Sequence, residues 1–218
     1  PFPNLLLAAA LSATAGAAAA EVQGTVVTND RLAVRFCSTP TAGLGSLEHR
    51  DSGVSLLAAA AAPPLFTLYV GPEGAGGREI SSQEAKRSAV AAEKTGDDTR
   101  VTLTYGEFPV AGLTVVATAI VPARGPLTTW TLNVRFAEPT ALRAVRFPQV
   151  AAVPAIGEAA DDVFVLPSLP GALIRNPSQA WGPNQAVWLK YPGDLSAQFL
   201  AYQDPRAGLY LASQDAQA

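Results

Sequence analysis

The stretch TTWTLNVRF, residues 128–136, decides the fold class. Its apolar residues stand at every second position: Trp130, Leu132, Val134 and Phe136. Successive side chains of a β-strand point to opposite faces of a sheet, so this alternation predicts a strand with one buried and one solvated face. A helix would instead need apolar residues three and four positions apart. The stretch therefore indicates an antiparallel sheet with one face toward a core.

The same period of two recurs along the chain. RLAVRF (31–36) and RVTLTY (100–105) show it clearly, with turn-forming clusters of Asp, Asn and Gly between the strands. No motif repeats at a fixed period, so neither a propeller nor a solenoid is indicated. We predict one all-β domain, an antiparallel β-sandwich, over residues 21–218. Further strands are expected at residues 46–50, 65–70, 87–94, 112–121, 141–147, 163–166, 198–203 and 208–213.

The composition fits a folded domain and excludes nucleic acid as a partner. Of the 218 residues, 49% are hydrophobic, which is enough for a sizeable core. Only 15% are charged and the formal net charge is −3. Phosphate binding needs concentrated Lys and Arg, and no basic cluster occurs.

The first 20 residues have the pattern of a secretory signal peptide. An apolar run from Leu5 to Ala15 is followed by an Ala-x-Ala pattern at Ala18 and Ala20, which predicts cleavage before Glu21. The run is too short and too rich in alanine for a membrane span. A buried Ala-rich helix is the alternative. Neither Met nor a basic residue precedes the run, so we expect a fragment at this end and a secreted or periplasmic location.

The single cysteine and the single histidine offer little chemistry. Cys37 cannot form an intrachain disulfide, and we expect a buried, inert thiol because no histidine lies nearby in the sequence to activate it. His49 is expected at a sheet edge, facing solvent, without a second His or Cys to complete a metal site. A Ser-His-Asp hydrolase would also need a Gly-x-Ser-x-Gly elbow, and the chain has none. No metal and no cofactor are expected.

Four acidic residues were weighed as catalytic carboxylates. Glycoside hydrolysis needs two carboxylates held across the scissile bond. We expect the candidates to be solvated in turns or after a strand, so no catalytic residue is assigned. They are Glu107, Glu158, Asp161 and Asp162.

The richest surface candidate is NPSQAWGPNQAVWLKYPGD, residues 176–194. Aromatic rings in a loop can present an apolar face to the C–H groups of a sugar. We assign carbohydrate binding to Trp181, Trp188 and Tyr191, with Asn184 as a hydrogen-bonding partner. The alternative is that these rings pack under a long loop as a satellite core.

A family resemblance enters at YPGDLSAQFLAYQDPRAGLYLASQD, residues 191–215. This segment resembles the end of the N-terminal β-supersandwich domain, related to galactose mutarotase, of large secreted glycoside hydrolases and their uncharacterised relatives. The strand at 208–212, Asp215 and the lead-in at 191–193 match that pattern, whereas Gln203 stands where another aromatic residue is expected. The sequence from residue 31 to residue 70 resembles the first strands of the same domain.

The resemblance implies a catalytic (β/α)-barrel downstream of residue 218, which would carry the catalytic acids. The chain would then be the non-catalytic N-terminal domain of a secreted, glycoside hydrolase-like enzyme. It would support or line the cleft of the barrel, with a polysaccharide or oligosaccharide as the other partner. The alternative is a stand-alone secreted carbohydrate-binding or adhesion module. A complete mutarotase-like enzyme is disfavoured, because ring opening needs an acid and a base and His49 has no placed partner.

Overall fold

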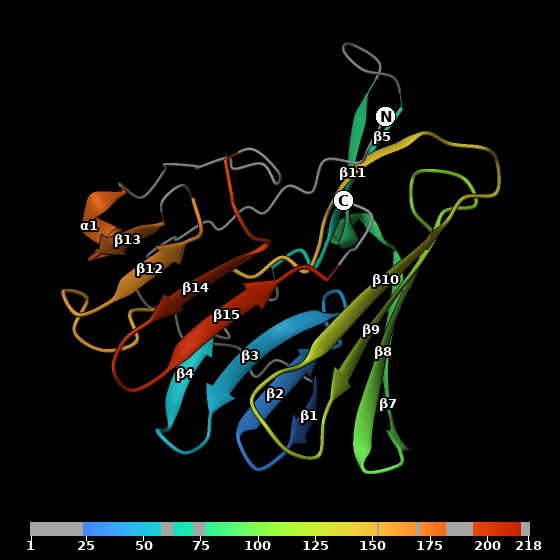
Figure 1. Cartoon of the computed structure of the whole chain (residues 1–218). Coiled ribbons are helices and arrows are strands. Elements are labelled where there is room, and N and C mark those ends of the chain that lie inside the picture. The colour runs from blue at the N-terminus through green and yellow to red at the C-terminus, as the bar shows by residue number, and fades with distance from the viewer. Residues whose placement is uncertain are drawn as a thin grey trace.

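The computed structural model describes residues 24–57, 63–71, 77–151, 153–168, 171–181 and 194–214. Within these ranges nearly all regular structure is β-strand, and the strand pairs are antiparallel. The all-β class and the antiparallel pairing are confirmed. The strands belong to four sheets (Figure 1). The proposed signal peptide, residues 1–20, lies outside the described residues.

The first sheet has the order β1-β2-β3-β4: β1 (Gly24–Thr28), β2 (Leu32–Cys37), β3 (Gly43–His49) and β4 (Val54–Leu57). The second has the order β10-β9-β8-β7: β7 (Arg87–Thr95), β8 (Asp98–Gly106), β9 (Thr114–Val121) and β10 (Thr129–Arg135). The third has the order β11-β5-β6: β5 (Thr67–Val70), β6 (Arg78–Ser81) and β11 (Leu142–Arg146). The fourth has the order β13-β12-β14-β15: β12 (Val163–Leu166), β13 (Ala172–Arg175), β14 (Phe199–Gln203) and β15 (Gly208–Ala212).

Helix is confined, within the described ranges, to two short turns. A 3-10 turn at Ser82–Glu84 precedes β7, and α1 spans Pro177–Ala180. The expected strand at residues 87–94 is thus confirmed as β7, with one helical turn before it. No described helix has the length and the hydropathy needed to cross a membrane.

The stretch at residues 128–136 forms β10, as its alternation of apolar and polar residues predicts. Its apolar side chains pack against the first core, and its polar side chains are exposed. The ring of Trp130 lies 5.9 Å from that of Phe36 and 6.2 Å from that of Phe147, centroid to centroid. β10 therefore ties the second sheet to residues of β2 and of the segment that follows β11.

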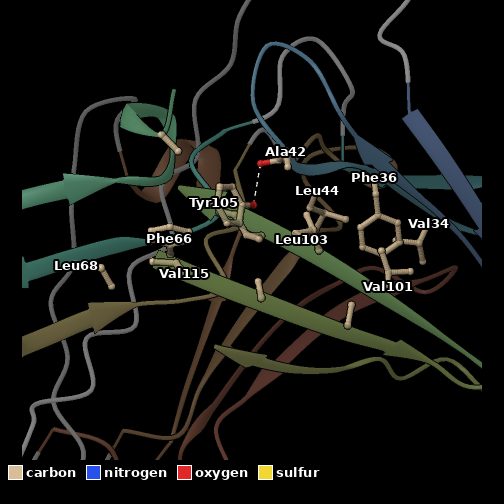
Figure 2. Close-up of a cluster of buried hydrophobic side chains, with 14 of the residues drawn as sticks. Val34, Phe36, Ala42, Leu44, Phe66, Leu68, Val101, Leu103, Tyr105 and Val115 are labelled. Carbon is tan, nitrogen blue, oxygen red and sulfur yellow. Dashed lines mark hydrogen bonds between the residues drawn. The ribbon is translucent and has the colours of Figure 1, made fainter. Parts of the chain in front are cut away.

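The first core joins the first, second and third sheets (Figure 2). Phe66, just before β5, meets Tyr105 of β8 edge-on with ring centroids 5.0 Å apart. The Tyr105 hydroxyl donates a hydrogen bond of 2.9 Å to the carbonyl of Ala42, which satisfies the polar atom of this buried ring. Cys37 is also fully buried, as predicted, and burial raises the pKa of its thiol while Arg35 lowers it in part.

A second core joins the first sheet to the fourth. β4 contributes to both cores, because Leu57 packs in the first and Val54 and Leu56 pack in the second. The first sheet thus lies between the second and the fourth, as Figure 1 shows. The second core fixes which face of the fourth sheet is covered and which points outward.

Candidate functional site

Of the four residues assigned to carbohydrate binding, Trp181 is described. It follows α1, is half-buried, and meets Phe164 edge-on with ring centroids 5.1 Å apart and an interplanar angle of 72°. Its ring packs against the second core. Asn184, Trp188 and Tyr191 lie outside the described residues.

The four candidate carboxylates occupy two kinds of environment. Glu107 is exposed directly after β8, and Glu158 and Asp161 are exposed in one turn, where the N–H of Asp161 donates to the carbonyl of Glu158 at 2.8 Å. The prediction of solvated acids holds for these three. It is wrong for Asp162, which is only 1% exposed. The sequence pattern missed this burial because Asp162 is covered by a strand 40 positions further along the chain.

That covering strand is β14. In the pairing of β12 with β14, Val163 lies opposite Gln203 and Phe164 lies opposite Tyr202, so the side chains of Asp162 and Tyr202 share the inward face. The Tyr202 hydroxyl donates a hydrogen bond to Oδ2 of Asp162. Oδ1 of Asp162 is buried and has no hydrogen-bond partner among the described residues. Asp162 therefore joins β12 to β14 and does not reach solvent.

A second polar contact fixes the hairpin turn between β14 and β15. Oδ1 of Asp204 accepts from the backbone N–H of Arg206 at 2.7 Å and of Ala207 at 3.1 Å, and Oδ2 accepts from Nε of Arg206 at 3.0 Å. Burial opposes ionisation of Asp204, but these donors outweigh it and lower the pKa of the carboxyl. Arg206 also donates to the carbonyl of Ile156, which ties the turn to the loop before β12.

The stability of the chain is expected to fall as the pH rises above about 10. Burial, followed by the hydrogen bond and charge of Asp162 and the charge of Asp204, raises the pKa of Tyr202, and burial raises that of Tyr105. The folded chain keeps protons that the unfolded chain releases near pH 10, so this stabilisation is complete below pH 10 and is lost above it. Urea unfolding at pH 8 and pH 11 measures the effect. The drop should be smaller in Tyr105→Phe than in the wild type; an equal drop in the two proteins contradicts the prediction.

The outward face of the fourth sheet is left partly exposed by this packing. On β15, Leu209 is buried and Leu211 packs against the second core, whereas Tyr210 between them is 51% exposed. The Tyr210 ring stacks on Phe199 of β14, with centroids 5.6 Å apart and planes 29° apart. Leu173 of β13, on the same face, is 66% exposed. We define the outward face by the outward residues of β12 to β15: Val163, Val165, Leu173, Arg175, Phe199, Ala201, Gln203, Gly208, Tyr210 and Ala212.

Phe199 and Tyr210 were not among the residues assigned to binding from the sequence. The sequence signal that could have identified Tyr210 is the alternation in the hairpin, where a leucine stands on each side of the tyrosine. His49 ends β3, with Nδ1 2.8 Å from the hydroxyl of Ser52. In the part of the chain that the structure describes, no three His, Cys, Asp or Glu side chains lie close enough together to hold a metal ion.

Comparison with known proteins identifies no family for the chain. It matches no protein-family model, and no curated protein matches it significantly.

Proposed function

We propose that the chain is the non-catalytic, β-sandwich domain of an exported, glycoside hydrolase-like enzyme, of the supersandwich, galactose-mutarotase-like kind. The proposal rests on one observation, which is that β15 of the fourth sheet is buried on one face and exposed on the other. Two leucines of the family-like strand, Leu209 and Leu211, hold β15 on the second core, while Tyr210 is left exposed. A domain that supports or lines the cleft of a neighbouring barrel needs a sheet of this kind, with one face packed on the core and an exposed apolar group on the other.

The layering of the sheets supports the sandwich description. The first sheet has one core toward the second and third sheets and another toward the fourth. Stacked sheets of this kind keep their inward residues apolar and their outward residues polar. The fourth sheet departs from that rule on its outward face, where Leu173 and Tyr210 are exposed, which is why we assign the lining of the cleft to this face.

The positions of the acids support a non-catalytic role. Asp162 is hydrogen-bonded to Tyr202 inside the fold, whereas Glu107 is exposed directly after β8, and Glu158 and Asp161 are exposed in one turn. Two carboxylates that flank a sugar must face one cleft across a separation of about 5–10 Å. Glu158 and Asp161 share a single exposed turn, where a carboxylate is solvated.

The proposal is tested on the protein that the natural gene encodes, from start codon to stop codon. We expect a segment of alternating strands and helices after residue 218, hydrolysis of glycosides, and a mature protein that begins at Glu21. Loss of hydrolysis should follow substitution of carboxylates in the barrel, while Glu107→Gln and Glu158→Gln should keep wild-type activity. A gene product without a further folded segment, or loss of activity in Glu158→Gln, would overturn the proposal.

A stand-alone carbohydrate-binding or adhesion module is the second candidate. It is favoured by Trp181, which anchors the start of the aromatic segment 176–194 at the rim of the second core. This function predicts that soluble oligosaccharides change the tryptophan emission of the purified chain and release heat on titration. Unchanged emission and no heat would rule it out.

A further inference from the structure

The outward face contains a continuous row of side chains that crosses the whole fourth sheet. Val165 of β12 pairs with Leu173 on one side and with Ala201 on the other, and Ala201 pairs in turn with Tyr210. Paired residues point to the same side of a sheet, so the row runs perpendicular to the strands. Three strand spacings of about 4.8 Å make it about 14 Å long. The row is therefore an extended, narrow track.

One end of this track carries an aromatic platform. Phe199 lies on β14 next to Ala201, and its ring stacks nearly parallel to that of Tyr210. Half of the Tyr210 side chain is open to solvent. Aromatic faces bind the C–H faces of a sugar ring, and the phenol hydroxyl adds a polar group at the edge. The stacking of the two rings holds the platform in place before a ligand arrives.

The charge of the face selects among ligands. Arg175 is the one charged residue among the ten that define the outward face, and it pairs with Val163. On the other side of Val163, Gln203 of β14 is its partner. A guanidinium and an amide therefore flank the apolar row on one side. These groups suit the hydroxyls of a neutral chain, whereas an acidic polymer would meet a single positive charge.

The size of the face argues against a protein partner as its main occupant. Strands of four or five residues are about 14–17 Å long, so the flat area of the sheet face is about 200–240 Å². A stable protein interface buries about 800 Å² on each partner. A second copy of this chain would therefore need much more surface than the outward face provides.

We propose that the outward face binds a neutral polysaccharide chain, which stacks on Tyr210 and Phe199 and follows the row toward Leu173. This inference rests on the proposed function, since the polysaccharide would be the substrate guided along the cleft that the domain lines. It assigns recognition to the fourth sheet and not to segment 176–194.

The test is affinity electrophoresis and calorimetry of the purified chain with soluble β-glucan, xylan, galactomannan and starch, and with polygalacturonate as the acidic comparison. We expect binding to at least one neutral polymer. Tyr210→Ala and Phe199→Ala should each weaken it roughly two- to tenfold. Tyr210→Phe keeps the ring and should lose less affinity than Tyr210→Ala does. The matched control is Val26→Ala on β1, because Val26 is also 51% exposed but lies on another sheet.

Each outcome decides the inference. Thermal melting should show that Tyr210→Ala is folded, so that lost binding reports on the platform. Undiminished binding by both alanine variants would overturn the platform and leave a carbohydrate function elsewhere on the chain. Binding to polygalacturonate alone, or self-association that Tyr210→Lys abolishes, would also overturn it. Absence of all polysaccharide binding would overturn the inference, while the hydrolysis assay on the full gene product would still decide the proposed function.

Discussion

Phe66→Ala is expected to destabilise the folded chain by about 3–5 kcal/mol. Phe66 is fully buried where the first, second and third sheets meet, between Tyr105 at 5.0 Å and Phe108 at 6.4 Å, ring centroid to centroid (Figure 2). Truncation removes most of a ring from these contacts and leaves a cavity that strands of three sheets cannot easily close. Since a domain of this kind is stable by only about 5–15 kcal/mol, the loss is a large share of the total.

Urea unfolding followed by far-UV circular dichroism measures this effect. The matched control is Leu127→Ala, on the segment between β9 and β10, because Leu127 is 60% exposed and its truncation should change the stability by less than about 0.5 kcal/mol. A midpoint for Phe66→Ala close to that of the control would mean that the three sheets do not share one core.

The longer strands could be predicted from the sequence because they are long enough to display the period of two. The stretches at 87–94 and 128–136 became β7 and β10, with bounds that differ by at most one residue. In strands of four or five residues alternation is a weak signal: β12 was predicted, whereas four others were missed, namely β1, β4, β6 and β13.

The arrangement of the sheets could not be predicted, because it depends on pairings between distant segments. β5 pairs with β11 across more than 70 positions, and β12 pairs with β14 across the whole of β13, α1 and the aromatic segment. No local pattern encodes which of two similar strands will be chosen. This is also why the sequence indicated an antiparallel all-β fold but not the division of its strands into four sheets.

The candidate site was predictable only in part, for the same reason. Trp181 could be singled out from composition, but its contact with Phe164 depends on where α1 lies beside β12 and β13. The platform of Phe199 and Tyr210 required knowing which face of the hairpin the second core covers. Asp162 looked like a solvated turn residue until the register of β12 and β14 placed Tyr202 over it.

Tyr202→Phe is expected to destabilise the chain by about 3 kcal/mol, although it removes a single oxygen atom. The Tyr202 hydroxyl is the one hydrogen-bond donor to the Asp162 carboxylate among the described residues, and the other carboxylate oxygen is already without a partner. Without the hydroxyl, a carboxylate that is 1% exposed has no hydrogen bond at all. A buried polar atom left unpaired costs far more than an average hydrogen bond contributes, and a charged one costs the most.

A double-mutant cycle with Asp162→Asn separates this cause from a loss of packing. An amide at position 162 is neutral, so in that background Tyr202→Phe should cost only about 1 kcal/mol, the contribution of one neutral hydrogen bond. Tyr210→Phe, on the exposed side of the neighbouring strand, should change the stability by less than about 0.5 kcal/mol. Equal costs for Tyr202→Phe in both backgrounds would show that the charge of Asp162 is not what the hydroxyl stabilises.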